Sequence, residues 1–252
     1  MNLLRSWRPF LWLLTTLALV GGSIAATPAT AQAADEPTLT VQSTGLTVGG
    51  KVAISGTGWT VQDGSSGSTI AVKIDDGAYN RLPGQTVDPK PSVWAIIQAG
   101  DDGSFSTTIT LPTGTNSRPA FAPGTHWLRF LTGSLKAGDV IRTKSSGNLA
   151  VAKAASTTSL SLNKKKIKKS KKAVATVRVS SIGTPAPTGA VKVYDGKKVI
   201  KKATLKASAK GVVKVTLPKL KKKGTHKIKV TYVGNTVAKA STSKVVKLKV
   251  TK

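Results

Sequence analysis

The sequence predicts an all-β protein made of two tandem sandwich domains. Apolar and polar residues alternate with a period of two in both halves of the chain, and Gly, Pro, Asp and Asn separate the alternating runs. The second half lacks the 3.6-residue period of an amphipathic helix. Several short motifs also recur in the same order in both halves. Together these observations indicate strands packed in layers.

The first 33 residues predict a cleavable secretory signal peptide. Arg5 and Arg8 precede an apolar run at residues 10–20, which is shorter than the roughly 20 residues that cross a bilayer. Ala31-Gln32-Ala33 fits the small-residue pattern of a cleavage site. We therefore expect a secreted mature chain without a transmembrane span. The alternative is an uncleaved N-terminal anchor.

The composition excludes several classes of chemistry. The chain of 252 residues has no Cys and only two His, which excludes disulfides, thiolate metal sites and most triads. Glu36 is the only Glu, so an opposed carboxylate pair for glycoside hydrolysis is not expected. The sequence predicts a protein that is not an enzyme and that holds no cofactor or metal.

Charge divides the chain into two parts. Residues 35–150 carry nine basic and nine acidic side chains, whereas residues 151–252 carry 28 basic side chains and one acid, Asp195. The change falls in a stretch of small residues at 150–158, which is typical of a linker. The predicted parts are a signal peptide (1–33), a near-neutral domain (38–152), a linker (153–156) and a lysine-rich domain (157–252).

The number of expected strands predicts the fold of the second domain. Seven short alternating segments within about 100 residues are typical of an immunoglobulin-like sandwich. These segments are residues 159–162, 173–179, 190–194, 199–205, 212–217, 227–232 and 245–250.

The first domain is also rich in expected strands, but its loops are longer. Its Pro residues fall between the apolar runs, where a missing N–H costs no ladder hydrogen bond. The expected strands are residues 39–41, 51–55, 70–74, 93–97, 105–111, 127–131, 140–141 and 149–151.

Three matched motifs indicate that the two domains are related. Their order is the same in both halves, but their offsets differ, so strands persist while loops change in length. The matched pairs are residues 72–77 with 191–196, 109–112 with 215–218, and 124–126 with 224–226.

The second domain resembles the bacterial Ig-like domains of the group 3 type, which occur as tandem modules in actinobacterial secreted proteins. The motifs that carry this resemblance are residues 157–162, 187–196 and 224–234. The first domain resembles another actinobacterial Ig-like surface domain through residues 55–59, 71–77, 102–105 and 126–133. The second resemblance implies a surface module of a kind that can accompany haem-transport proteins.

His126 and His226 occupy equivalent places in the two repeats. Equivalent placement predicts a framework role, such as a hydrogen bond at a strand start. As a shared metal pair, the two would need the domains to fold onto each other. Asp75, Asp76 and the nearby carboxylates at Asp88, Asp101 and Asp102 form turns in the favoured interpretation, and bind Ca²⁺ in the alternative one.

The three tryptophans of the mature chain all lie in the first domain. Trp94 and Trp127 are expected in the core, because a sandwich without a disulfide needs large apolar side chains. Trp59 stands between Gly58 and Thr60 at a strand end and is the tryptophan most open to a surface role. With Tyr79, it forms the predicted ligand face of this domain.

Lysine gives the strongest functional signal. Unpaired like charge attracts polyanions, whereas the alternative is a solvated surface that prevents strand-to-strand association. Lys in place of Arg suits point-charge attraction to phosphates more than base reading, so no sequence-specific nucleic acid partner is expected. The predicted polyanion-binding residues are Lys164, Lys165, Lys166, Lys168, Lys169, Lys171, Lys172, Lys219, Lys221, Lys222 and Lys223.

We therefore expect a secreted, cell-wall-associated, non-enzymatic protein that mediates adhesion or interaction. Its second domain would bind an anionic cell-wall polymer or another extracellular polyanion. Its first domain would present loops to a protein or carbohydrate. Two alternatives stay open: a passive spacer whose lysines only keep it soluble and, from the resemblance of the first domain alone, an accessory module of a haem-uptake system.

Overall fold

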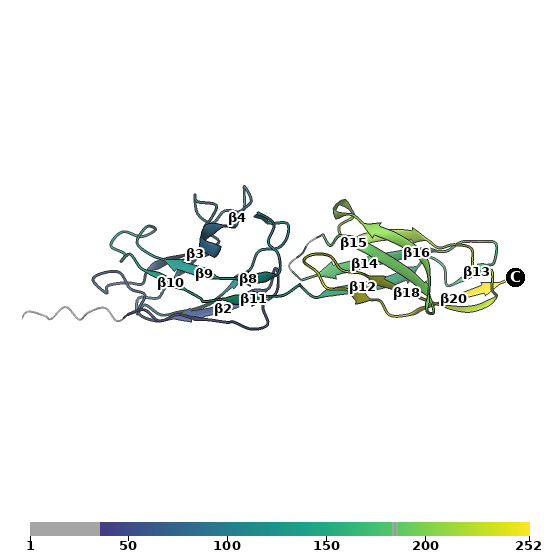
Figure 1. Cartoon of the computed structure of the whole chain (residues 1–252), viewed down its shortest axis with the longest axis horizontal. Coiled ribbons are helices and arrows are strands. Elements are labelled where there is room, and N and C mark those ends of the chain that lie inside the picture. The colour runs from purple at the N-terminus through teal and green to yellow at the C-terminus, as the bar shows by residue number, and fades with distance from the viewer. Residues whose placement is uncertain (1–35, 183, 185) are drawn as a thin grey trace, which may run out of the picture. The chain divides into compact units, whose positions relative to one another are not determined.

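The computed structural model describes residues 36–182, 184 and 186–252. The predicted signal peptide, residues 1–33, lies outside the described residues. The described chain forms two β-sandwiches, as Figure 1 shows. Its helical elements are two 3₁₀ turns, η1 (Asp75–Gly77) and η2 (Ala207–Ala209). The all-β fold expected from the alternation is confirmed.

The first sandwich packs a sheet of order β1-β2-β6 against one of order β10-β9-β3-β5, and two-stranded pairs β11-β8 and β4-β7 complete it. Every named pair of strands here is antiparallel. The strands are β1 (Thr40–Val41), β2 (Lys51–Gly56), β3 (Thr69–Ile74), β4 (Asn80–Arg81), β5 (Ala95–Gln98), β6 (Phe105–Thr110), β7 (Ser117–Arg118), β8 (Gly124–His126), β9 (Leu128–Leu131), β10 (Thr143–Ser145) and β11 (Leu149–Val151).

The core of the first sandwich is rich in large aromatic side chains. Trp59, Trp94, Phe121 and Phe130 are all buried, together with aliphatic residues from both sheets. The alternation seen in the sequence accounts for the aliphatic part, because alternate residues of β2 face inward. The aromatic volume fills the space between sheets that no disulfide ties together.

The second sandwich packs a sheet of order β12-β14-β17 against one of order β13-β20-β18-β15-β16, with β19 paired to β18. β13 runs parallel to β20, and every other named pair of strands here is antiparallel. The strands are β12 (Ser156–Leu162), β13 (Lys166–Lys168), β14 (Val174–Ser181), β15 (Gly189–Asp195), β16 (Lys198–Leu205), β17 (Val212–Thr216), β18 (Gly224–Tyr232), β19 (Ser241–Thr242) and β20 (Val246–Thr251).

The second core is aliphatic apart from one ring. Val177, Val193, Val230 and Leu248 are buried, and Tyr232 is the only aromatic side chain among them. The Tyr232 hydroxyl donates to the Thr188 carbonyl at 2.7 Å, so its polar end is satisfied inside the domain. Regular alternation in β18 puts these apolar side chains inward and the lysines outward.

All seven strands predicted for the second domain are present, and the structure adds β13 and β19. In the first domain the predicted strand at residues 140–141 is wrong. The strand there is β10, which begins at Thr143, and Ile141 is 85% exposed. The Asp139 carboxylate accepts hydrogen bonds from Ser68 Oγ and the Thr69 N–H, and these bonds hold the preceding segment as a loop.

Candidate functional site: paired His–Asp contacts and a lysine surface

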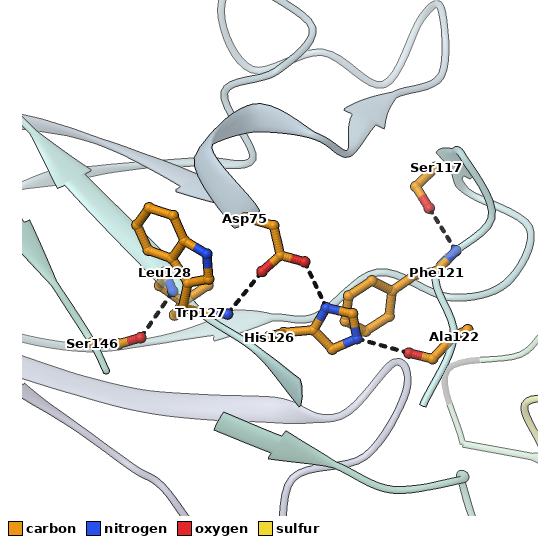
Figure 2. A network of polar contacts seen from close by, with 8 residues as sticks. All are labelled: Asp75, Ser117, Phe121, Ala122, His126, Trp127, Leu128 and Ser146. Atoms are coloured by element: carbon orange, nitrogen blue, oxygen red, sulfur yellow. Dashed lines mark hydrogen bonds and ion pairs between the residues drawn. The ribbon is translucent and has the colours of Figure 1, made fainter. Parts of the chain in front are cut away.

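Each sandwich contains the same histidine contact. In the first, His126 Nδ1 lies 2.7 Å from Asp75 Oδ2, and Nε2 lies 2.9 Å from the Ala122 carbonyl oxygen (Figure 2). In the second, His226 Nδ1 lies 2.5 Å from Asp195 Oδ2, and Nε2 lies 2.8 Å from the Lys222 carbonyl oxygen. Each histidine thus ties a loop four residues upstream to the end of a neighbouring strand. The predicted framework role is confirmed.

The aspartates that contact the two histidines differ by one position in the alignment of the repeats. The sequence match aligns Asp76 with Asp195, but the structure gives the role of Asp195 to Asp75. Asp75 also accepts from the Trp127 N–H at 2.8 Å (Figure 2), while Asp76 forms an ion pair with Arg129. The first domain therefore carries one extra acidic residue at this turn, and both Asp75 and Asp76 adopt positive φ values, which Asp tolerates better than most residues.

The acceptors around His226 favour its charged form. A carboxylate and a carbonyl oxygen can each accept but not donate, so both ring nitrogens must carry a hydrogen for both bonds to form. Burial by itself would lower the pKa of His226, but the hydrogen bonds to Asp195 and the Lys222 carbonyl oppose it, and the net pKa is raised. The ring thus engages the only acid of the second domain.

The predicted ligand face of the first domain is wrong, because Trp59 is buried. Its indole N–H donates to the Thr38 carbonyl at 2.7 Å, and its ring meets Phe105 edge-on at a centroid distance of 6.0 Å. Gly56 lies so close that an added Cβ would be 2.8 Å from the indole nitrogen of Trp59 and 2.8 Å from the Phe105 ring. This glycine thus lets the backbone pack against the ring, whereas the neighbouring Gly58 suggested an open strand end in the sequence.

Tyr79, the other half of that face, is half-buried. Its ring packs edge-on against Phe121 at 5.0 Å and against His126 at 5.7 Å between centroids. It therefore supports the His126 contact. Trp94 is buried as expected, and its indole N–H donates to the Thr110 carbonyl at 2.8 Å. Trp127 is half-buried.

The acidic residues of the first domain serve turns and ion pairs. Asp102 accepts from the N–H and hydroxyl of Ser104, and Asp88 accepts from the Lys90 N–H. Among the described residues, no group of three or more His, Cys, Asp or Glu side chains has the arrangement of a metal site. The turn interpretation of these residues matches the observed hydrogen bonds.

A polar groove runs along the open edges of the first sandwich. It has a volume of about 500 Å³ and lies between β5 and β6, with Arg81, Trp94 and Gln98 among its lining residues. The Arg81 guanidinium stacks over the Trp94 ring at 4.5 Å and donates to its carbonyl. Sequence reasoning missed this groove, because Arg81 and β6 meet only through the sheet topology.

The eleven lysines predicted to bind polyanions are all exposed. The register of the sheet explains how they gather. Gly224, Val250 and Ile167 form one row across β18, β20 and β13. β18 begins at this row, and β13 ends one residue beyond it. The residues just before β18 (219–223) and just after β13 (169–172) therefore lie at the same end of the sandwich. The structure therefore joins two clusters that are about 50 residues apart in sequence, while Lys164, Lys165, Lys166 and Lys168 lie in β13 and just before it.

A second groove lies close to this end, between the edge strands β16 and β17. It has a volume of about 390 Å³, and three lysines line it: Lys172, Lys201 and Lys214. Lys201 and Lys214 were not among the predicted binding residues. The strand alternation alone could not bring them together, because they belong to opposite sheets.

Comparison with known families identifies the second sandwich. Residues 153–251 match the family model described as a bacterial Ig-like domain (group 3). The second sandwich is a bacterial Ig-like domain. No curated protein matches the chain. Among the described residues, no helix has the length and apolar character needed to cross a membrane.

Solved structures similar to this chain come from several kinds of protein. The fibronectin(III)-like modules of Clostridium thermocellum CbhA are 16% identical, covering 84% of this chain and 95% of that one, with a TM-score of 0.28. The titin fragment A168–A169 is 13% identical, covering 86% and 99%, with a TM-score of 0.38. The Escherichia coli adhesin FdeC is 12% identical, covering 87% and 65%, with a TM-score of 0.34. At these TM-scores the similarities identify no ligand for this chain.

Proposed function

We propose that this protein is a secreted, non-enzymatic interaction protein of the cell surface, held on an anionic extracellular polymer by its Ig-like second domain. The observation that carries the proposal is the charge balance of that domain: residues 157–252 carry 27 basic residues and one acid. The single acid, Asp195, is already engaged by His226. The lysines therefore have no carboxylate of their own domain to neutralise them, and an external polyanion supplies the missing charge.

The joined clusters at residues 169–172 and 219–223 support this proposal electrostatically. Exposed charges interact over about 8–10 Å at physiological salt, so lysines gathered at one end act on the same ligand. Phosphorylated or uronic polymers of a Gram-positive wall carry charges at regular intervals. The near-neutral first domain then remains available to a protein or carbohydrate partner, through its loops and the groove beside Arg81.

The direct test is co-sedimentation of the mature chain with purified Gram-positive cell walls at increasing salt. We expect binding at 0.05 M NaCl and release below 1 M, because screening shortens to about 3 Å at 1 M. Walls stripped of their anionic polymers should retain much less protein. A variant with the eleven predicted lysines changed to Gln is the matched control, and it should bind weakly at every salt concentration.

Two results would contradict the proposal. If the mature chain stays in solution at low salt, the lysines only keep the protein soluble and the chain is a passive spacer. If binding persists unchanged at 1 M salt or on stripped walls, a neutral component holds the protein. A change in the absorbance of haem on titration with the protein would favour the accessory role in haem uptake.

A further inference from the structure

The outward face of the sheet β13-β20-β18-β15-β16 carries a second group of lysines, which we call the lysine face. Six of them are exposed and two, Lys192 and Lys229, are half-exposed. Each occupies an outward position of the alternating strand to which it belongs. The eight members are Lys166, Lys168, Lys192, Lys202, Lys227, Lys229, Lys247 and Lys249.

The register places these lysines directly opposite one another. Lys192 pairs with Lys202, Lys227 with Lys247, and Lys166 with Lys249. Directly opposite side chains in a sheet have Cβ atoms about 5 Å apart, and like charges at that separation destabilise the sheet. Along one strand, outward residues follow each other at about 6.6 Å. The face is therefore a grid of cations that an anion bound between two strands would stabilise.

In the part of the chain that the structure describes, no side-chain carboxylate faces this grid. Tyr194 and Asp195 are neighbours in β15, so their side chains point to opposite sides of the sheet. Asp195 points inward to His226 Nδ1, whereas Tyr194 points outward beside Lys229, whose Nζ lies 5.6 Å from the ring centroid. Since Asp195 is the only acid of the domain, the face is cationic throughout.

From this geometry we infer that the lysine face is the docking surface for a flexible linear polymer with one phosphodiester per repeat and no bases, a poly(alditol phosphate). This inference rests on the proposed function and names its ligand class. A flat grid of flexible point charges suits a chain of phosphates that can adapt its spacing. Tyr194 is the one aromatic residue on the face and Lys229 covers it, so nucleic-acid bases find no free stacking platform.

The side chains between the lysines fit the same ligand. Thr225 lies opposite Lys249, Thr231 opposite Lys192, and Thr251 opposite Lys168. Thr231 Oγ1 shares a hydrogen bond with Thr242 Oγ1, and Thr251 Oγ1 donates to the Ile167 carbonyl at 3.4 Å, so both hydroxyls can still accept from the free hydroxyls of an alditol. The Thr225 hydroxyl has no partner among the described residues and can donate to a phosphate oxygen.

The test compares two variants of the mature chain that lose the same charge. The face variant is K192Q/K227Q/K229Q/K247Q, and the loop variant is K206Q/K210Q/K239Q/K244Q, which changes four exposed lysines that belong neither to the lysine face nor to the predicted clusters. Affinity for purified poly(glycerol phosphate) is measured by calorimetry from 0.05 to 0.5 M NaCl. We expect the face variant to lose at least tenfold in affinity and the loop variant less than threefold. The log–log salt dependence of the face variant should become shallower by about 3, at 0.7 per lost contact.

Each other outcome has a distinct meaning. Equal losses in both variants would show that only total charge matters; the docking surface would then be refuted while the proposed function stands. Failure of the unaltered chain to bind the polymer at 0.05 M salt, together with binding to intact walls, would refute the ligand class alone. Failure on both would refute the proposed function as well. Equal or tighter binding of single-stranded DNA would also overturn the assignment. Circular dichroism confirms that both variants are folded.

Discussion

The two sandwiches have the same internal contact but opposite surfaces. Each fixes a loop to a strand end through a histidine that bridges an aspartate and a carbonyl oxygen. Residues 35–150, which include most of the first sandwich, balance nine basic with nine acidic residues, whereas residues 151–252, which include the second sandwich, carry a net charge of +27 from 28 basic residues and one acid. The comparison shows that the same internal framework can carry two very different surfaces.

The aromatic rings of the two sandwiches also differ in position, since the first buries several and the second has one on its outer surface. Removing a buried ring should give the largest loss of stability. Trp59→Ala should destabilise the first sandwich by about 3–5 kcal/mol, because it leaves a large cavity beside Phe105. The equivalent loss of an aromatic ring from the second sandwich, Tyr194→Ala, should cost less than about 0.5 kcal/mol, since this ring lies on the outer surface. Urea titration followed by the methyl NMR signals of each core measures both values.

A result in which Tyr194→Ala destabilises its domain as much as Trp59→Ala does would contradict the distinction between inner and outer rings. The core of the unaltered sandwich serves as the internal control in each variant. Its unfolding midpoint should not move.

The next largest effect concerns the shared histidine contact. Asp195→Asn and Asp75→Asn should each destabilise their own sandwich by about 1–3 kcal/mol, because a buried ring nitrogen loses its carboxylate acceptor. The loss in the first sandwich should be the larger one. Asp75 accepts from His126 Nδ1 with one oxygen and from the Trp127 N–H with the other, and Asn has a single acceptor oxygen. Among the described residues Asp195 bonds only His226, so the amide oxygen of Asn can keep that bond and only the charge is lost. The same urea titration checks the order.

A shared framework predicts that neither substitution affects binding to cell walls in the co-sedimentation assay. Weakened binding of a folded Asp195→Asn variant would show that Asp195 belongs to the ligand surface, and the separation of framework from surface would be wrong. Asp75→Asn is the matched control, because it makes the same chemical change in the near-neutral domain.

The charged state of His226 gives the second sandwich a pH dependence. Because its pKa in the folded protein is raised above the ordinary value of 6.5, protonation stabilises the fold. This contribution is fully present below pH 6.5 and is lost as pH rises through the raised pKa. We therefore expect a higher urea midpoint at pH 6 than at pH 8. Lysine charge is constant over this range, and His226→Asn should abolish the difference. An unchanged midpoint in the unaltered protein would mean that the ring is not charged.

Sequence reasoning succeeded where a local pattern determines structure. Alternation alone identified all seven main strands of the second domain, and the equivalent placement of His126 and His226 predicted their framework role. It failed where partners are distant in sequence. The histidines meet aspartates 51 and 31 residues away, and one inserted acid shifted the apparent match from Asp75 to Asp76. Gly58 beside Trp59 suggested exposure, but Gly56 lets the chain pack directly against the ring.

The lysine surface shows the same limit. Clusters of consecutive lysines were visible in the sequence, and residues 166–168 nonetheless form a strand, β13, because Ile167 packs into the core. Which lysines oppose one another depends on strand register, which a sequence with lysines at nearly every outward position leaves open. The opposed pairs Lys192–Lys202 and Lys227–Lys247 could therefore be identified only from the sheet.

The smallest expected effect tests whether repulsion between the opposed lysines lowers the stability of the second sandwich. Lys192→Thr removes one charge of the pair with Lys202 and should stabilise the second sandwich by about 0.2–1 kcal/mol in low salt. Lys73→Thr in β3 is the matched control, since Lys73 faces Arg129 across the strands but the Asp76 carboxylate engages that arginine. At 0.5 M NaCl the gain from Lys192→Thr should vanish, because screening removes the repulsion it relieves. A gain that persists in high salt would come from the strand propensity of Thr. In that case the lysines would not repel one another measurably, so a bound anion would relieve no repulsion. The affinity of the lysine face would then have to come from direct contacts alone.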